Sequence, residues 1–194
     1  MAKYFELTDF KWINKPDNFN ISGNNLTIDP KSETDLWQRT YYGFRNDNAP
    51  MFVTEIEGDF TFTVKAAFDY KNQYDQCGIV LYDNNENWVK VSVEQENETF
   101  ARLGSVVTKS GYSDWATTDI GAEVYEMWYC LSRRGQDYYI EYSTDGKLFK
   151  QMRMLHFPGT EARVGVYACS PVKAGFKATF SEFKFEDCRW QSHK

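Results

Sequence analysis

Short stretches in which apolar and polar residues alternate recur along the whole chain, and they constrain its fold more than any other feature. A strand sends successive side chains to opposite faces, so a period of two is typical of a half-buried strand. The clearest case is WVKVSVE at 88–94. Its odd positions are all valine, whereas its even positions carry an indole, an ammonium, a hydroxyl and a carboxylate. No long segment has the period of an amphipathic helix, so an all-β fold is predicted.

Turn residues separate these stretches and divide the chain into roughly ten to thirteen expected strands, almost all antiparallel. The Asp145-Gly146 pair predicts a hairpin between two of them. The expected strands include the segments 25–29, 59–70, 77–83, 88–95, 99–109, 126–134, 136–143, 163–170 and 176–187. The chain has 194 residues and contains no repeat and no domain-splitting linker. We therefore expect one domain over 1–194, a jelly-roll or concanavalin-like sandwich of two packed antiparallel sheets.

Composition excludes several classes of partner. Aromatic residues make up 18% of the chain, which is incompatible with general disorder. The formal net charge is −6, which argues against nucleic acid and anionic membranes as partners, because both call for a basic patch. No apolar run approaches the ~20 residues that a membrane-spanning helix needs. The opening residues MAKYFELTDFKW lack the apolar core of a secretory signal. A cytoplasmic location is expected.

The residues that most often bind metals or activate nucleophiles are scattered. Cys77, Cys130, Cys169 and Cys188 lie far apart and form no CxxC pair, so free core cysteines are expected and a zinc site is not. The two histidines lie outside any nucleophile-base pattern, and no glycine-rich phosphate loop is present. The acidic turn DNNEN at 83–87 is more typical of a polar hairpin than of a calcium site. No cofactor or metal is predicted.

The polar face of WVKVSVE gains further members if its neighbours in sequence are its neighbours in the sheet. The short 83–87 link predicts a hairpin with the preceding strand, and the strand after residue 98 is expected on the other side. On this basis Gly78 and Gly104 are expected to leave space on the shared face. The side chains expected on it are Gln76, Tyr82, Trp88, Lys90, Ser92, Glu94, Arg102 and Thr108.

Two interpretations of this face stay open. One face of an antiparallel sheet is commonly solvated, and Lys–Glu pairs across strands are ordinary there. The mixture of aromatic rings with charges instead favours a groove that holds a sugar, because rings stack on the apolar sugar face while fixed polar groups bind the hydroxyls. We predict that the polar face is the floor of a groove on the concave side of the sandwich.

Two further stretches could complete such a groove. Ser113, Asp114 and Trp115 follow a glycine turn and could form a loop that closes over a ligand. The alternative is an Asx-type turn capped by Asp114, with Trp115 covering the edge of the core. The stretch TDLWQRTYY at 34–42 contains Asp35, Trp37, Tyr41 and Tyr42, which could line one end of the groove or serve as core and turn.

The run of residues 94–98 superficially resembles the alternating carboxylates of jelly-roll retaining glucanases, with glutamates at 94, 96 and 98. Retaining glycosidases place two carboxyl groups about 5–5.5 Å apart, and strand neighbours at i and i+2 lie ~6.5–7 Å apart at Cα. Those glucanases have apolar residues between the acids, whereas Gln95 and Asn97 intervene here. The sequence therefore favours a binding function over a catalytic one.

The motifs in combination resemble a known family. Their order is DLW at 35–37, GDF at 58–60, YDQCG at 74–78, NWVKVSVE at 87–94, SVVT at 105–108, SDW at 113–115, STDG at 143–146, VGVYACSP at 164–171 and F-x-x-F-x-F at 180–185. This order is similar to the domain of unknown function 1349, also called the regulation-of-enolase family, over about residues 9–187. The resemblance implies a concanavalin A-like sandwich, no settled activity, and a tie to carbohydrate metabolism.

The family motifs include positions that alternation also selects. The matching residues are Tyr74, Asp75, Gln76, Trp88, Lys90, Glu94, Thr108, Ser113, Asp114 and Trp115. Asp75 is an awkward member, because its parity places it on the valine face unless a bulge redirects it. Without Tyr74, these nine residues, Asp75 included, form the predicted ligand-binding set.

Three functions remain open at this point. In the first, Lys90 and Glu94 bind the hydroxyls or carboxylate of a carbohydrate or sugar-derived metabolite, Gln76 and Thr108 add neutral hydrogen bonds, and Trp88 or Trp115 stacks. In the second, Glu94 acts with Asp75 or Asp114 as acid and base in a glycosidase-like or sugar-modifying enzyme. In the third, the sheet face binds another protein of carbohydrate metabolism.

Overall fold

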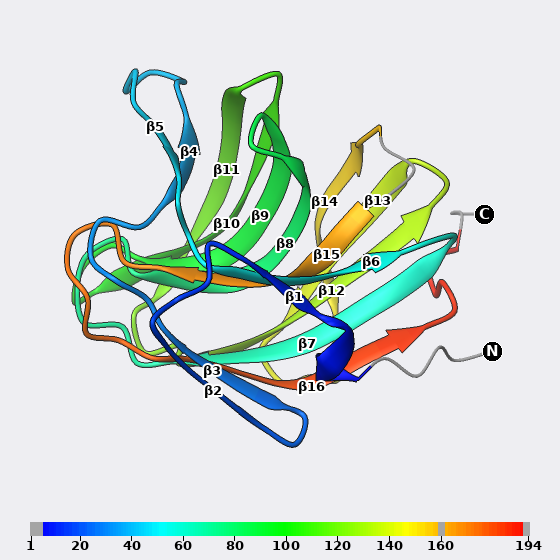
Figure 1. Cartoon of the computed structure of the whole chain (residues 1–194), viewed down its shortest axis with the longest axis horizontal. Coiled ribbons are helices and arrows are strands. Elements are labelled where there is room, and N and C mark those ends of the chain that lie inside the picture. The colour runs from blue at the N-terminus through cyan, green and yellow to red at the C-terminus, as the bar shows by residue number, and fades with distance from the viewer. Residues whose placement is uncertain (1–5, 159–161, 192–194) are drawn as a thin grey trace.

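The computed structural model describes residues 6–158 and 162–191. Two seven-stranded sheets are stacked as layers, and a separate two-stranded hairpin rises beside the curved strands β8 to β11 (Figure 1). The first sheet has the order β1 (Lys11–Ile13), β6 (Met51–Ile56), β15 (Ala162–Cys169), β8 (Gln76–Asn84), β9 (Asn87–Gln95), β10 (Phe100–Lys109) and β11 (Tyr112–Gly121).

The second sheet forms the other layer of the sandwich (Figure 1). Its order is β14 (Lys150–His156), β13 (Asp137–Ser143), β12 (Glu126–Arg134), β7 (Phe60–Phe68), β16 (Ala178–Glu186), β3 (Asn25–Asp29) and β2 (Asn18–Ser22). The small hairpin consists of β4 (Leu36–Gln38) and β5 (Arg45–Asp47), and one 3-10 turn covers Leu7–Asp9. No helix in the described part of the chain is long and apolar enough to span a membrane.

The predicted all-β sandwich of two antiparallel sheets is confirmed, since every strand pair of the three sheets is antiparallel. The predicted strand number is too low, because sixteen strands lie within the described residues. Four of the short strands, β1, β2, β4 and β5, fall in the first 50 residues. The strands β1, β4 and β5 have only three residues each, which is too short for a period-of-two pattern to be recognised.

The register confirms which residues share each face of the first sheet. Gln76 pairs with Glu94, and Glu94 pairs with Arg102 on the other side. In the same way Val80 and Val106 flank Lys90. The predicted polar face is therefore a real row of neighbours, which we call the outer face of the first sheet. The opposite, valine face packs between the two sheets and belongs to the main hydrophobic core.

A second, smaller core lies on the outer face under the β4–β5 hairpin. Leu36 and Trp37 of the hairpin pack there with Trp88, Val80 and Val106 of the sheet. Burying this apolar patch attaches the hairpin to the sheet, because the two-stranded unit is too small to be stable alone.

The glycines of the outer face do not leave the space that the sequence suggested. A Cβ at Gly78 would meet the carbonyl oxygen of Val91, and a Cβ at Gly104 would lie 2.6 Å from the carbonyl oxygen of Ala116. Neighbouring backbone therefore fills both positions, and glycine is required for close approach of the strands.

Two other sequence predictions concern a turn and the cysteines. The Asp145-Gly146 turn joins β13 to β14 as predicted, with Gly146 at φ +69°. All four cysteines are free, and all except the half-buried Cys188 lie in the interior.

Candidate functional site

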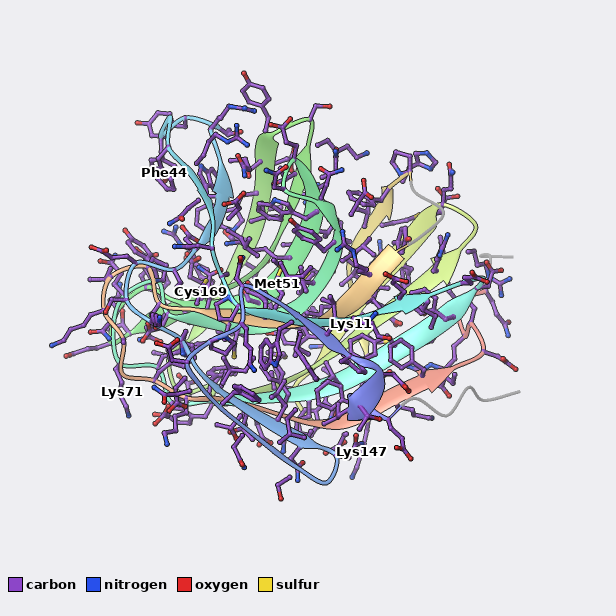
Figure 2. The ribbon with its side chains drawn as sticks, in the orientation of Figure 1. Lys11, Phe44, Met51, Lys71, Lys147 and Cys169 are labelled. Carbon is purple, nitrogen blue, oxygen red and sulfur yellow. The ribbon has the colours of Figure 1, made fainter. Side chains whose placement is uncertain are left out.

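A cavity of about 460 Å³ lies between the β4–β5 hairpin and the outer face of the first sheet. Ligand pockets in proteins commonly measure about 300–1,000 Å³, so its size suits a small molecule. Figure 2 shows Phe44, one of its lining residues, on the connection between β4 and β5, away from the stacked sheets. The hairpin and the loops contribute Asp35, Trp37, Tyr42, Phe44, Asn46, Tyr74, Pro171 and Val172. The sheet strands and Glu96 contribute Gln76, Lys90, Glu94, Glu96, Arg102, Val106 and Trp115.

The floor of the cavity is a chain of polar side chains. Lys90 Nζ donates to Gln76 Oε1 at 2.8 Å and lies 3.4 Å from Asp35 Oδ1. Tyr167 Oη donates to the same Gln76 oxygen at 3.0 Å. With Oε1 taken by two donors, the Gln76 amide nitrogen is directed at Glu94, and it donates to Glu94 Oε2 at 2.8 Å. The amide orientation is thus fixed by its partners.

The carboxyl group of Glu94 is strongly perturbed by this arrangement. The pKa of its carboxyl is raised from the usual 4.5 to about 7. Burial is the largest cause, and the carboxylates of Asp35 and Glu96 also raise it, whereas Lys90 and Arg102 lower it. Loss of water dominates because it disfavours the charged form. Near neutral pH, Glu94 is consequently present in both protonation states.

Arg102 forms part of the cavity wall. Its Nε lies 3.5 Å from Glu96 Oε2 and 3.9 Å from Asp119 Oδ1. The guanidinium carbon lies 5.4 Å from the ring centre of Trp115, within the range of a cation–π contact. The arginine is therefore held by carboxylates on one side and an indole on the other.

Aromatic rings form the wall opposite the sheet. Trp37 meets Trp115 edge to face at 6.2 Å and Tyr42 at 5.6 Å. Tyr42 in turn stacks on Phe44 at 5.9 Å. The outer rings Tyr42, Phe44 and Tyr74 are 57%, 46% and 39% exposed, so they can contact a ligand.

Four of the nine predicted ligand-binding residues line this cavity: Gln76, Lys90, Glu94 and Trp115. Their ligand-binding role stays a prediction, but the structure does bring them together. Of the residues whose role was left open, Asp35, Trp37 and Tyr42 line the cavity as well. Tyr41 does not, since its side chain is 93% exposed at the tip of the hairpin.

Trp88, predicted as a stacking residue, is placed differently. It is fully buried in the second core beneath the hairpin. The expectation that it stacks on a ligand is therefore corrected. The residue shares the predicted face, but the hairpin covers that end of it.

Thr108 and Ser113 are buried too, and they position the hairpin. Their hydroxyl oxygens lie 2.8 Å apart, and Ser113 Oγ accepts a hydrogen bond from the backbone N–H of Gln38 at 2.9 Å. Neither residue lines the cavity. The predicted direct hydrogen bond from Thr108 to a ligand is corrected to a tie between the sheet and β4.

Asp75 and Asp114 lie outside the cavity. Asp75 is buried, and its Oδ2 accepts hydrogen bonds from the backbone N–H groups of Lys71 and Asn72 at 2.9 and 2.8 Å. Asp114 is exposed and pairs with Arg153 of β14 at 3.0 Å. Alternation directs Asp114 away from the face that carries Trp115. Neither aspartate is available as the acid–base partner of Glu94.

Some residues of the site had a weaker signal in the sequence. Phe44 and Val172 lie in irregular segments without alternation, so no pattern selected them. Tyr167 could have been found, because it alternates with Val166 and Ala168 in VGVYACS, and its hydroxyl reaches the outer face. In the described residues, no group of three or more histidine, cysteine or acidic side chains is arranged to hold a metal ion.

Comparison with solved structures gives several likenesses of the whole sandwich. A crystal structure of a functionally unknown protein from Saccharomyces cerevisiae matches with a TM-score of 0.88 and 32% identity, covering 94% of this chain and 98% of that one. The GH43 protein BlXynB from Bacillus licheniformis matches at a TM-score of 0.71 and 20% identity, over 92% of this chain but 37% of its own. A legume lectin-like domain from Entamoeba histolytica matches at 0.63 with 6% identity, covering 93% and 91% of the two chains.

The GH43 and lectin-like matches show the fold alone, because their sequence identity is low. A sequence relative carries more. "Regulation of enolase protein 1" of Saccharomyces cerevisiae is 32% identical over 183 residues, which are 94% of this chain and 91% of the relative. The model of the family described as "Protein of unknown function (DUF1349)" matches residues 12–188. With a match of that extent and a relative this similar, the chain belongs to the DUF1349 family.

Proposed function

We propose that the protein binds a carbohydrate or a sugar-derived metabolite in the cavity between the β4–β5 hairpin and the first sheet. One observation carries the proposal: a polar floor of fixed orientation meets an aromatic wall in a cavity of about 460 Å³. Sugars present apolar C–H faces and directional hydroxyls, and such a site complements both.

The polar floor can both donate and accept hydrogen bonds. Lys90 supplies ammonium protons, and Asp35 supplies carboxylate oxygens. Glu94, with a pKa of about 7, donates in one protonation state and accepts in the other. Hydrogen bonds to charged groups contribute roughly 1.5–3 kcal/mol each, enough to fix the orientation of a ligand.

The likenesses support the proposal at a coarser level. Matched structures are described as a GH43 protein and a legume lectin-like domain, both of which concern carbohydrates by name. The name of the yeast relative concerns the regulation of enolase. These names support a sugar-related function for the fold, whereas the side chains of the cavity support binding at this site.

A matched pair of variants on β11 tests the proposal. Trp115 lines the cavity, and its neighbour Asp114 points to the opposite face. In calorimetric titrations with neutral monosaccharides, amino sugars and disaccharides, the wild type is expected to bind at least one sugar. Trp115→Ala should weaken that binding about tenfold or more, and Asp114→Ala should leave it unchanged. Equal affinity in wild type and Trp115→Ala would exclude the cavity as the site.

A second candidate function is a glycosidase-like activity. The observation that favours it is a carboxyl with a pKa of about 7, Glu94, in one cavity with the carboxylates of Asp35 and Glu96. A protonated acid beside an ionised partner is the arrangement that glycoside hydrolysis uses. Hydrolysis of nitrophenyl glycosides by the wild type, lost in Glu94→Gln, would support it. If a sugar binds but is not hydrolysed during an incubation of several hours, the catalytic function is excluded and the binding function stands.

Two further expectations remain proposals. A protein partner could contact the exposed aromatic tip of the hairpin, where Tyr41 and Tyr42 meet edge to face at 5.1 Å. If no sugar shifts the melting temperature of the wild type, binding of a protein partner becomes the leading candidate function. The cytoplasmic location can be tested by fractionating cells that express a tagged chain.

A further inference from the structure

The two cations of the cavity are already neutralised by the protein itself. The Lys90 side chain is 5% exposed, and its ammonium group is held by Gln76 Oε1 and the Asp35 carboxylate. Arg102 is held by Glu96 and Asp119 at 3.5 and 3.9 Å. A phosphate or carboxylate on a ligand would be repelled by the carboxylates that already accompany both cations. The cavity is therefore a poor site for an anion.

Glu94 is the exception among these charged groups. Its only hydrogen bond within the described residues comes from the neutral amide of Gln76, at 2.8 Å. No ammonium or guanidinium group of the described chain lies within ion-pair distance of it. Among the described residues, the cavity thus contains one carboxyl group that has no cation in ion-pair contact, and a positive charge on a ligand would supply that contact.

The aromatic wall is suited to the same kind of charge. The faces of aromatic rings carry partial negative charge and attract cations within about 6 Å of the ring centre. Trp115 already receives the Arg102 guanidinium in this way, at 5.4 Å. Tyr42, Phe44 and Tyr74 have exposed rings that no described cation covers, and they line the same cavity as Glu94.

We propose that the ligand of this cavity carries a protonated amine, as an amino sugar does, and that its ammonium group is held between Glu94 and the aromatic wall. The inference rests on the proposed function in taking the ligand to be sugar-derived. It goes further in assigning the ligand's charge, and it sets sugar phosphates and sugar acids aside.

Binding of this kind is coupled to the protonation of Glu94. The charged and titratable groups that face this carboxyl are Lys90 of β9, Arg102 of β10, Glu96 after β9, Asp35 before β4, Tyr74 before β8, and Tyr167 and Cys169 of β15. An ammonium ligand needs the ionised form of Glu94, which becomes scarce when the pH falls below the pKa of about 7. Between pH 5.5 and 7, the affinity for an amino sugar is expected to rise about 15-fold, in proportion to the ionised fraction.

The experiment is calorimetric titration with D-glucosamine and D-glucose, which differ in a single substituent. At pH 7 the wild type is expected to bind D-glucosamine at least tenfold more tightly than D-glucose. Glu94→Gln keeps the hydrogen bond with Gln76 and removes the charge, and it should abolish that preference. Asp114→Asn removes a negative charge from the opposite face, so it should leave the preference intact and excludes a general effect of net charge.

The outcomes separate this inference from the proposed function. Equal binding of the two sugars, or a preference that survives in Glu94→Gln, would overturn the amine while leaving a sugar site in place. Failure of the wild type to bind either sugar would overturn both. Because the pH titration uses the wild-type protein alone, an affinity for D-glucosamine that stays flat between pH 5.5 and 7 would count against the inference even if Glu94→Gln failed to fold.

Discussion

The outer face of the first sheet has two ends that come from the same strands and differ in chemistry. At one end, Trp88 of β9 is buried under the β4–β5 hairpin. At the other end, Glu94 of the same β9 lines an open cavity. Six residues along one strand thus separate a core position from a site position. Parity decides which face a residue occupies, whereas the element that covers the face decides what the residue does there.

The boundary between the two ends is set by how the hairpin is tied down. The Gln38 side chain bridges the hairpin to the sheet by donating to the Asn85 carbonyl oxygen at 2.9 Å and accepting from Arg45 Nε at 2.8 Å. Arg39 and Arg45 both reach Glu86, at 3.3 and 3.1 Å. These ties cluster near one end of β9, so the hairpin is closed there, and the cavity lies beyond it.

The largest expected effect is a loss of stability on substitution at the covered end. Trp88→Ala removes a fully buried indole from the second core and should lower the free energy of unfolding by about 3–5 kcal/mol, which urea denaturation would measure. Trp115→Ala is the matched control at the open end. Its indole is only half-buried, so its loss should cost about 1–2 kcal/mol. Equal losses in the two variants would mean that the two ends do not differ as described.

The difference between the two ends was only partly accessible from the sequence. Alternation in 76–82, 88–94 and 102–108 predicted the shared face, and the register confirms it. It could not show that Trp88 is covered, because the cover is two strands of three residues each, more than forty positions earlier in the chain. Such short strands carry no periodicity, and their place over the sheet is a long-range packing outcome.

Asp75 and Asp114, which were predicted to bind a ligand but lie outside the cavity, illustrate the same limit. Asp114 is adjacent to Trp115 in sequence, but alternation sends it to the side where Arg153 lies. The preceding glycine favours a loop or an Asx-type turn at residues 113–115, where parity does not apply, although they belong to β11. A strand assignment would have separated the two residues. Asp75 conversely has the parity for burial, and its Oδ2 accepts hydrogen bonds from two backbone N–H groups of the adjacent turn.

A second prediction concerns Glu94 at the open end, where a residue of the site should lower the free energy of unfolding. The folded-state pKa of Glu94 lies near 7, above its usual 4.5, so the folded protein binds more protons between these values. Its stability therefore falls as pH rises through this window, and the full cost is present above pH 7. Glu94→Gln should raise the free energy of unfolding by about 1–2 kcal/mol at pH 8, allowing for partial exposure.

At pH 4.5 the same substitution should have almost no effect, because Glu94 is then protonated in the folded state and its neutral acid resembles the amide. Urea denaturation at the two pH values measures both quantities. A Glu94→Gln variant less stable than the wild type at pH 8 would show that Glu94 is stabilised as a carboxylate. The open end would then be built like the covered one, for stability and not for a ligand.

The smallest expected effect concerns the hydrogen bonds of Ser113 that tie β4 to the sheet. Ser113→Ala removes the acceptor of the Gln38 backbone N–H, and it leaves the Thr108 hydroxyl without its partner. A lost buried hydrogen bond costs about 1 kcal/mol of stability. The sharper measurement is hydrogen exchange of the Gln38 amide, whose protection should fall while that of Val91 in the main core is retained. Thr118→Val, exposed on the same strand, is the control.

Because the hairpin forms one wall of the cavity, loosening it should also lower the affinity for a ligand, since binding would then have to order the wall. If Gln38 stayed protected and affinity did not change, the hairpin would be held by its apolar contacts alone, and the covered end would position the open one without help from this polar pair.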